Sequence, residues 1–259
     1  MVVWSKKQNN FFNIAFTQVI ALSCLLPLGG LFICEILCCL LVFDESTSTK
    51  CDKSDHVWNF LPSVSQATGQ FAPQKHIWRI VIALHATPRF AIAFGYFSLH
   101  LLVFSDGSSL SRAFRRLSGA ACALHCTEIL ALVGLSFVSS TEDFEVHKFF
   151  FLTFLCSATI HMALMCFLQG WGTKAIKYWL SKKEQLSVRL KVRLFALHLL
   201  FLVSAMYFYY RHNKYCENGV YSLFGLCEIL LIMTNIAFHA TAMIDFHTTD
   251  LILQDFPDR

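Results

Sequence analysis

Long apolar runs dominate the hydrophobic pattern of the chain, and six of them are long enough to cross a lipid bilayer. A spanning helix needs about 20 mostly apolar residues. No internal repeat or domain linker interrupts the series. The pattern therefore predicts an all-α integral membrane protein, with one polytopic domain over residues 1–259 and about six transmembrane helices in a single bundle. The predicted spans are 17–43, 77–104, 116–138, 149–169, 190–210 and 220–244.

The composition agrees with a membrane protein. Hydrophobic residues make up 56% of the chain and charged residues 15%, and the mean hydropathy is +0.53. A soluble domain keeps about a quarter of its residues charged. The net charge of +4 is small, and no basic stripe with interleaved aromatic residues is present. The sequence therefore argues against nucleic-acid binding.

The positions of Lys and Arg predict how the bundle is oriented. With six spans both termini lie on one side, and cytoplasmic segments carry an excess of Lys and Arg. Of the 21 such residues, thirteen, beginning with Lys6 and Lys7, fall on the side of the termini and seven on the opposite side. The remaining one, Arg89, lies within a span. We therefore expect cytoplasmic termini, with a solvated basic loop over residues 174–193 or, as the alternative, contact of that loop with anionic lipid.

Cysteine positions give an independent prediction. Nine of the 11 cysteines lie inside predicted spans, where a thiol behaves as a small apolar side chain. The other two, Cys51 and Cys216, fall in loops that we expect to be lumenal, and that compartment permits disulfides. We predict a Cys51–Cys216 disulfide, with two unrelated free thiols as the alternative.

The second span contains the segment RIVIALHATPRFAIAFGY, which places two polar side chains, His85 and Arg89, within the bilayer. A charge at this depth costs about 2.5 kcal/mol or more. Steps of 4, 7 and 4 residues put His85, Arg89, Tyr96 and His100 on one helix face. The spacing predicts a polar stripe whose members line a common feature, and Pro88 can kink the helix beside it.

Acidic side chains on two other spans are candidate partners for Arg89. Glu128 lies on the third span and Glu228 on the sixth, where Asn235 and His239 continue the same face. By helical rise these groups lie at similar depths in the lumenal half. Arg89 can pair with Glu128 or Glu228, either to fix helix register or to form a functional site. Three more imidazoles come from the third, fourth and fifth spans: His125, His161 and His198.

The known soluble-enzyme motifs are missing from the chain. It contains no G-x-S-x-G, H-E-x-x-H, P-loop, dinucleotide glycine pattern or H-x-x-x-x-D. Zinc needs three or four nitrogen, sulfur or oxygen ligands, and one conceivable set is His85, Glu128, His161 and Glu228. Sequence does not bring ligands from separate helices together, so we predict no metal.

A lipid pocket fits these residues better than a metal site. Arg89 offers a planar fork of donors that suits a phosphate or ester oxygen, and aromatic residues of the lumenal loops suit the membrane interface around its mouth. The catalytic candidates are His85, Arg89, Glu128 and Glu228. The substrate-binding candidates are Arg89, Trp58, Asn59, Tyr96, Arg211, His212, Asn235 and His239.

Five stretches in fixed order carry a family resemblance: NFLPSVS, PQKHIWR with LHATPRF, SSTEDFEVH, YFYYRHNKYCENGVY and TNIAFHATAMIDF. They resemble the family of post-GPI-attachment-to-proteins factor 2. That family belongs to a six-span group with damage-regulated autophagy modulators and the N-terminal half of a yeast cell-wall protein that remodels GPI lipids. The resemblance covers about residues 15–246. Ala86, Thr87 and Asn218 depart from the family pattern, and none of these departures removes an ionisable group.

The resemblance implies a multi-pass protein of Golgi and endoplasmic reticulum membranes that supports fatty-acid remodelling of GPI anchors. In this step a saturated acyl chain is restored to lyso-GPI, which sustains surface display of GPI-anchored proteins. The implied partners are GPI-anchored proteins with their lyso-GPI lipid, membrane lipids and a remodelling enzyme. No cofactor is implied beyond acyl-CoA or a phospholipid as acyl donor.

Two functional hypotheses follow for the site residues. In the first, the chain is an acyltransferase or an essential subunit of one, in which Arg89 binds the lyso-GPI phosphate, His85 acts as base and Glu128 orients it. In the second, the chain is a non-catalytic lipid-binding scaffold that presents GPI anchors to a separate acyltransferase. A transporter is disfavoured because inverted repeats are absent.

Overall fold

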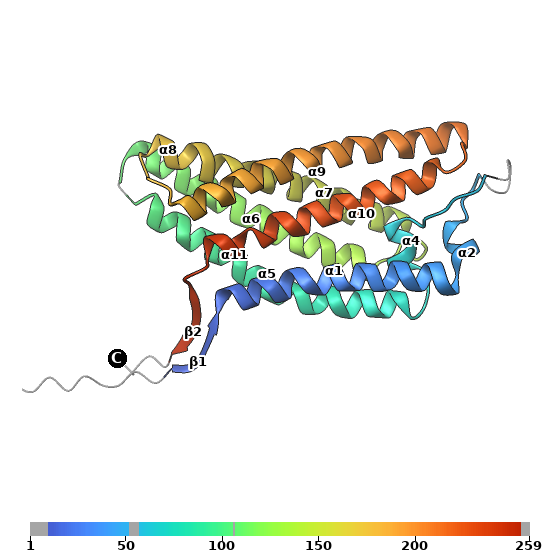
Figure 1. Cartoon of the computed structure of the whole chain (residues 1–259), viewed down its shortest axis with the longest axis horizontal. Helices are drawn as coiled ribbons and strands as arrows, with labels where there is room; N and C mark the ends of the chain where they lie inside the picture. Colours follow the sequence, from blue (N-terminus) through green and yellow to red (C-terminus); the bar gives the residue numbers. More distant parts are fainter. Residues whose placement is uncertain (1–9, 52–56, 106, 255–259) are drawn as a thin grey trace, which may run out of the picture.

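Six long helices make up most of the computed structural model, which describes residues 10–51, 57–105 and 107–254 (Figure 1). Each is long and apolar enough to span a membrane, which confirms the predicted multi-pass helical fold. The orientation residues Lys6 and Lys7 lie outside the described part of the chain. The helices are α1 (Phe16–Leu41), α5 (Gln74–Val103), α6 (Ser109–Phe137), α7 (Phe144–Cys166), α9 (Lys182–Tyr215) and α10 (Val220–Ala240).

Short elements occupy the two ends of the bundle. The disulfide end comprises residues 42–51, 57–73, 138–143 and 216–219, and includes α2 (Phe43–Thr47) and α4 (Val64–Gly69). The terminal end comprises residues 10–15, 104–105, 107–108, 167–181 and 241–254. Its elements are β1 (Asn10–Ala15), the π-helical turn η1 (Phe167–Gly172), α8 (Thr173–Ala175), α11 (Ala242–Asp245) and β2 (Asp250–Gln254).

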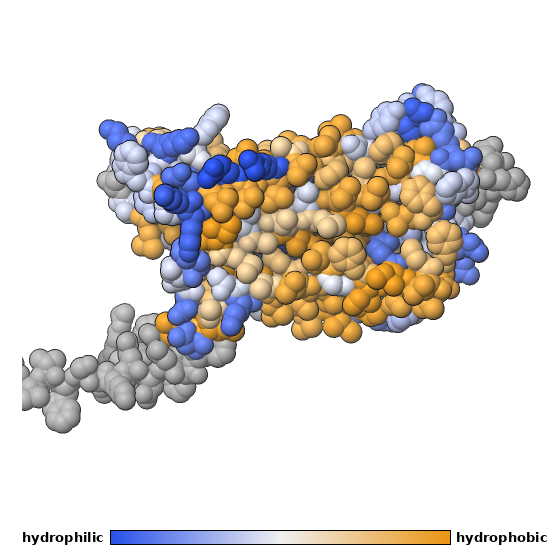
Figure 2. Space-filling view, viewed as in Figure 1, coloured by the Kyte–Doolittle hydropathy of each residue, from blue (hydrophilic) through white to orange (hydrophobic). Residues whose placement is uncertain are grey.

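The six helices close into a ring in chain order. Contacts join α1 to α5, α5 to α6, α6 to α7, α7 to α9, α9 to α10, and α10 back to α1. Figure 2 shows the outer surface that results, with apolar residues over the middle of the visible face and hydrophilic residues at both ends. Such a belt is the surface that a bilayer solvates.

Two apolar clusters fill the interior along the bundle axis. One, toward the terminal end, includes Phe16, Ile92 and Met162, and the other, toward the disulfide end, includes Trp78 and Ile82. Along α5, neither cluster has a buried member between Ile82 and Ile92. This middle layer is where the helices bring their polar side chains together.

The start of α9 corrects the predicted loop over residues 174–193. The helix begins at Lys182, eight residues before the predicted span, because Ser181 and Glu184 form a capping box that satisfies free N–H groups of the first turn. Within this basic segment the Lys191 side chain is only 1% exposed, so it is not part of a solvated charge run.

The loop before α4 is attached to the start of α10. Gly219 N–H donates to the Trp58 carbonyl at 2.9 Å, and Phe60 N–H donates to Ser222 Oγ at 2.7 Å. Gly225 allows the backbones to approach closely, because a Cβ there would lie 2.6 Å from the Pro62 carbonyl oxygen. These contacts hold α4 over the α10 face that carries Glu228.

A second contact at the disulfide end joins α5 to the loop before α7. Arg79 Nη2 forms an ion pair of 3.0 Å with Glu142. The Ser139 backbone N–H and the Arg79 guanidinium together lower the pKa of Glu142 to about 2. Glu142 therefore stays ionised in this contact throughout the physiological pH range.

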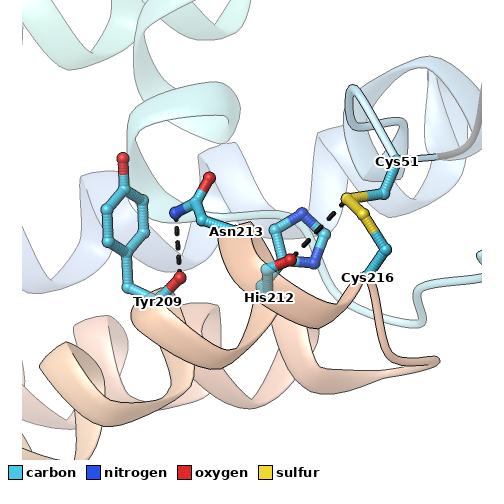
Figure 3. Close-up of a disulfide and its surroundings, with 5 residues drawn as sticks. All are labelled: Cys51, Tyr209, His212, Asn213 and Cys216. Carbon is cyan, nitrogen blue, oxygen red and sulfur yellow. Dashed lines mark hydrogen bonds between the residues drawn. A yellow bond between two sulfur atoms is a disulfide. The ribbon is translucent and has the colours of Figure 1, made fainter.

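The predicted disulfide is present. Cys51, after α2, is bonded to Cys216, at the end of α9, and the bridge closes a sequence separation of 165 residues (Figure 3). Cys51 Sγ also lies 3.7 Å from the His212 carbonyl oxygen. The bridge ties the first loop of the bundle to the last turn of α9, as the cysteine positions indicated.

We expect Cys51→Ser to lower the free energy of unfolding by about 2–4 kcal/mol, because a long cross-link restricts the unfolded chain. Thermal unfolding of the purified protein in detergent measures the change, and Cys216→Ser should give the same value. Cys39→Ser, at an exposed free thiol, is the control. A reductant that lowers the stability of Cys51→Ser as much as that of the wild-type protein would contradict this assignment.

The two ends of the described chain pair as a short antiparallel ribbon, which the hydrophobic pattern did not predict. β1 pairs with β2 from Asn10 opposite Gln254 to Ala15 opposite Asp250. The Phe16 N–H also donates to the Thr249 carbonyl at 2.9 Å. The ribbon fixes the start of α1 beside the segment that follows α11.

Candidate functional site

Polar side chains from four helices meet in the middle layer of the bundle, and we name them the polar cluster. Helical spacing of three or four residues aims two side chains inward from each of α5, α6 and α10. Every member is at most 6% exposed. The members are His85 and Arg89 on α5, His125 and Glu128 on α6, His161 on α7, and Asn235 and His239 on α10.

Arg89 is the centre of the cluster. Its Nη2 forms an ion pair with Glu128 and donates to Asn235 Oδ1 at 3.5 Å. Its Nε donates to His125 Nε2 at 3.2 Å, and its Nη1 lies 3.4 Å from His85 Nε2. A guanidinium has five N–H groups, so among the described residues one N–H on Nη1 is left for a further acceptor.

Glu128 accepts hydrogen bonds from the guanidinium and from two side chains beside it. Its Oε1 accepts from Arg89, from Asn235 Nδ2 at 3.0 Å and from His239 Nε2 at 3.3 Å. Its Oε2 is buried and has no hydrogen-bond partner within the described residues. Of the two acids that the sequence offered to Arg89, the structure therefore selects Glu128.

Three imidazoles stand next to one another beside this ion pair. The His125 ring centroid lies 4.5 Å from that of His161 and 4.6 Å from that of His239. The His161 and His239 rings are nearly parallel, at 12°. One ring nitrogen from each of the three lies within 4.8 Å of the other two. The sequence placed these histidines on three spans without predicting that they converge.

A cavity of about 90 Å³ leads to the polar cluster from the disulfide end. His85, Arg89 and Asn235 line its inner part, and Glu228 and Thr68 line it beside α4. Its other walls are mainly apolar and include Ile82, Leu132, Phe151, Phe154 and Leu231. An apolar cavity with a few convergent polar groups is the usual form of a ligand site.

His85 is held in one tautomer by its two neighbours. Its Nδ1 lies 3.3 Å from the Ile82 carbonyl oxygen, which only accepts, so this nitrogen carries the proton. Its Nε2 faces Arg89 Nη1, which only donates, so this nitrogen carries the lone pair. The unprotonated nitrogen Nε2 therefore contacts Arg89 at the wall of the cavity.

The predicted stripe on α5 divides into two parts. His85 and Arg89 belong to the polar cluster, whereas Tyr96 and His100 lie nearer the terminal end. Tyr96 Oη donates to Asp245 at 2.6 Å, and His100 Nδ1 pairs with Ser118 Oγ at 2.9 Å. The expectation that all four residues line one feature was wrong, because seven residues of helix separate Arg89 from Tyr96 by about 10 Å.

The structure also separates Glu228 from the other catalytic candidates. Glu228 accepts from the Val64 N–H at 3.1 Å, at the start of α4. Asn235 and His239, which continue its helix face, instead contact Glu128. Glu228 shares the cavity wall with Arg89 but makes no hydrogen bond to it among the described residues.

Four residues that the sequence placed in substrate-binding loops are used in the protein's own contacts. Trp58 and Asn59 lie at the disulfide end, whereas Arg211 and His212 belong to the last turns of α9 and not to a loop. The Trp58 N–H donates to Asn218 Oδ1 at 3.0 Å, and Asn59 Nδ2 donates to the Thr47 carbonyl at 3.2 Å. Arg211 pairs with Glu217, and His212 packs on Tyr221 at 4.7 Å between ring centroids. None of these four residues lines the cavity that reaches Arg89.

A second buried ion pair, which the sequence did not predict, lies near the terminal end. Lys191 Nζ is 2.6 Å from Asp245 Oδ2, and the two side chains are 1% and 6% exposed. Ser187 Oγ accepts from the same Nζ at 2.6 Å. The His198 imidazole, by contrast, pairs with Thr159 at 3.2 Å and belongs to neither ion-pair site.

Comparison with known proteins places this architecture in a family. The sequence profile of the Frag1/DRAM/Sfk1/Cwh43P N-terminal domain matches residues 15–249. No solved structure matches the chain.

Among named relatives, "Acyltransferase PGAP2" of Xenopus tropicalis is 39% identical over 95% of this chain and 93% of its own length. "Post-GPI attachment to proteins factor 2" of Drosophila melanogaster is 34% identical over 96% and 92%. The Schizosaccharomyces pombe "Protein cwh43" is 26% identical over 72% of this chain and 17% of its own length. The matched region contains all six membrane-spanning helices and the whole polar cluster, and the chain therefore belongs to the Frag1/DRAM/Sfk1/Cwh43P N-terminal domain family.

Proposed function

We propose that the chain is a membrane acyltransferase of GPI-anchor lipid remodelling, which restores a saturated acyl chain to lyso-GPI. The names of the Xenopus and Drosophila relatives, an acyltransferase and a post-GPI attachment factor, support this activity. The observation that carries it is the cavity. Its mainly apolar walls suit the carbons of a lipid next to its head group, and it is also lined by His85, Arg89 and Asn235, which suit a polar head.

Arg89 binds the phosphate of the lyso-lipid in this proposal. Its unused N–H on Nη1 is available at the cavity wall, and the planar guanidinium suits phosphate oxygens. Glu128 and Asn235 hold the two N–H groups of Nη2, so the fork is already oriented before the lipid binds. Pre-orientation of this kind lowers the entropic cost of reaching a reactive geometry.

His85 acts as the general base. Arg89 Nη1 turns from His85 Nε2 to the phosphate when the lipid binds, which frees the lone pair on Nε2. This lone pair then takes the proton of the lyso-lipid hydroxyl while the hydroxyl oxygen attacks the acyl carbonyl of the donor. The donor is an acyl-CoA thioester or a phospholipid ester. Its carbonyl carbon forms the new ester bond and loses the thiol or alcohol, which takes the proton back from His85. No oxidant or other cofactor is needed to balance the reaction.

The disulfide supports a lumenal position for the disulfide end, because secretory compartments allow such bonds to persist. With that orientation the termini are cytoplasmic and the cavity is reached from the lumenal half of the bilayer, where GPI anchors lie. We assign the protein to Golgi or endoplasmic reticulum membranes, with GPI-anchored proteins and their lipids as its partners.

The test is acyl transfer by the purified full-length chain in lipid nanodiscs. Lysophosphatidylinositol serves as the acceptor probe, acyl-CoA or a diacyl phospholipid as the donor, and mass spectrometry detects the product. His85→Gln is expected to lower product formation about 100-fold or more, because the glutamine amide cannot act as a base.

His100→Gln is the matched control, since His100 lies on the same helix and is also buried. Equal rates for His85→Gln and the wild-type protein would reject His85 as the base. A wild-type protein that binds the lyso-lipid through Arg89 but forms no product with either donor would reject the acyltransferase and support the scaffold hypothesis.

A further inference from the structure

The three imidazoles of the polar cluster form a group with the composition of a metal site, which we name the histidine triad. His125, His161 and His239 come from α6, α7 and α10. One ring nitrogen from each lies within 4.8 Å of the others. Around tetrahedral zinc, with bonds of about 2.0–2.1 Å, such nitrogens lie about 3.3 Å apart. Small rotations of the side-chain torsions are enough to shorten the distances between the nitrogens from those in the structure to those around zinc.

Two members of the triad already have the hydrogen-bond support that metal-bound histidines usually have. His161 Nδ1 lies 2.9 Å from the Ala121 carbonyl oxygen, so Nδ1 carries the proton and Nε2 the lone pair. His239 Nε2 lies 3.3 Å from Glu128 Oε1, so Nε2 carries the proton and Nδ1 the lone pair. A carbonyl or carboxylate behind the second nitrogen is the usual outer support of a metal-bound histidine.

The third member, His125, has a lone pair that a metal ion can share. Its Nε2 accepts from Arg89 Nε at 3.2 Å, so that nitrogen is unprotonated. A metal ion at His125 replaces Arg89 Nε as the partner of this lone pair. Arg89 keeps its ion pair with Glu128 and its contact with Asn235. The positive charge of the guanidinium therefore stays balanced by Glu128 after the exchange.

Two buried atoms of the cluster have no hydrogen-bond partner among the described residues, His125 Nδ1 and Glu128 Oε2. The second is an acceptor, and a metal site supplies a donor for it. Glu128 Oε2 has no hydrogen-bond donor among the described residues, although buried polar atoms nearly always have one. A water molecule on a metal ion is a strong donor. Glu128 would thus support His239 through one oxygen and a metal-bound water through the other.

We propose that the histidine triad binds one zinc ion. Neutral imidazoles are preferred ligands of zinc, and three histidines with an open fourth position are the ligand set of a catalytic zinc site. Neither the family resemblance nor the relatives' names assign a metal to these residues.

Charge gives the ion a chemical role that rests on the acyltransferase function proposed above. Arg89 and Glu128 cancel each other, so a divalent ion leaves the buried cluster with a net positive charge. An anionic or polarisable oxygen must then accompany it, because an uncompensated buried charge is costly. A zinc ion beside Arg89 thus favours a phosphate or acyl carbonyl oxygen, which it polarises as a Lewis acid.

The test is the metal content of the full-length chain, purified in detergent with a tag that contains no histidine run and without chelators. Inductively coupled plasma mass spectrometry is expected to find about one zinc ion per chain. His161→Ala should reduce this content tenfold or more. His198→Ala is the control, because His198 is a buried histidine outside the triad, and it should keep its zinc.

A second measurement covers the case in which His161→Ala does not fold. Chelator treatment of the wild-type protein should lower its melting temperature, and added zinc should restore it, since a ligand of the native state stabilises that state. Added Co²⁺ in place of zinc should give visible absorption bands that are absent from His161→Ala or, if this variant does not fold, from His239→Ala.

The outcomes separate this inference from the proposed function. A wild-type protein that forms acylated product but contains no zinc and binds no Co²⁺ overturns the zinc site and leaves the acyltransferase intact. A protein that contains triad-dependent zinc but forms no product supports the zinc site and rejects the acyltransferase. Zinc retained equally by His161→Ala and His239→Ala also overturns the site.

Discussion

Replacing Glu128 with glutamine is expected to lower the free energy of unfolding by about 3–5 kcal/mol, because it leaves a buried charge without its partner. Arg89 is 5% exposed and lies in the middle layer of the bundle. The glutamine keeps the shape of Glu128 and its contacts with Asn235 and His239, but it removes the anion. Arg89 would then keep only neutral acceptors.

Chemical or thermal unfolding in detergent, followed by circular dichroism, measures this loss. The control is Glu145→Gln, since the Glu145 side chain is 78% exposed and its ion pair contributes little. The double variant Arg89→Gln with Glu128→Gln should recover most of the stability, because neither charge remains. A double variant less stable than Glu128→Gln alone would contradict the buried ion pair as the cause.

Replacing Lys191 with methionine should destabilise the bundle to a similar extent, about 3–5 kcal/mol. The substitution keeps the apolar stem of the side chain but leaves Asp245 without its cation. Asp245 would keep the hydrogen bond from Tyr96 at 2.6 Å, which does not neutralise a carboxylate. The loss of stability should be largest where α11 packs against α9.

Proteolysis and thermal unfolding of the purified variants test this second expectation. Lys183→Met is the matched control, because Lys183 is an exposed lysine in the first turn of the same helix. Adding Asp245→Asn to Lys191→Met should restore stability by removing the unpaired anion. If Lys191→Met and Lys183→Met unfold at the same temperature, the 2.6 Å contact contributes nothing measurable.

The spans could be predicted from sequence because each is a long apolar run, and length and hydropathy suffice to identify a transmembrane helix. The boundaries of α9 could not be predicted in this way. The predicted span begins only at residue 190 and ends at 210, whereas the helix runs from its capping box at Ser181 to Tyr215. Burial of Lys191 depends on Asp245, 54 residues later, and no local pattern contains that pairing.

The polar cluster was partly predictable for a similar reason. Helical spacing correctly placed Arg89 beside His85, and Asn235 beside His239, because neighbours on one helix face follow from a fixed rise and turn. Which acid meets Arg89 depends on the rotation of α6 and α10 about their axes. The histidine triad needs three such rotations at once, so His125, His161 and His239 remained separate candidates in the sequence.

The strand ribbon and the disulfide together determine how this protein would carry a mechanical load. Because Asn10 pairs with Gln254 at the outer end of the ribbon, a force that separates the two chain ends opens β1 from β2 one residue pair at a time. The tension then passes along α1 to Cys51, crosses the covalent bridge to Cys216 and returns along α10. The chain between the two cysteines, including α5, α6, α7 and α9, is bypassed. A pull on the ends would therefore extract α1 and α10 first and leave the other four long helices unloaded until the bridge is reduced.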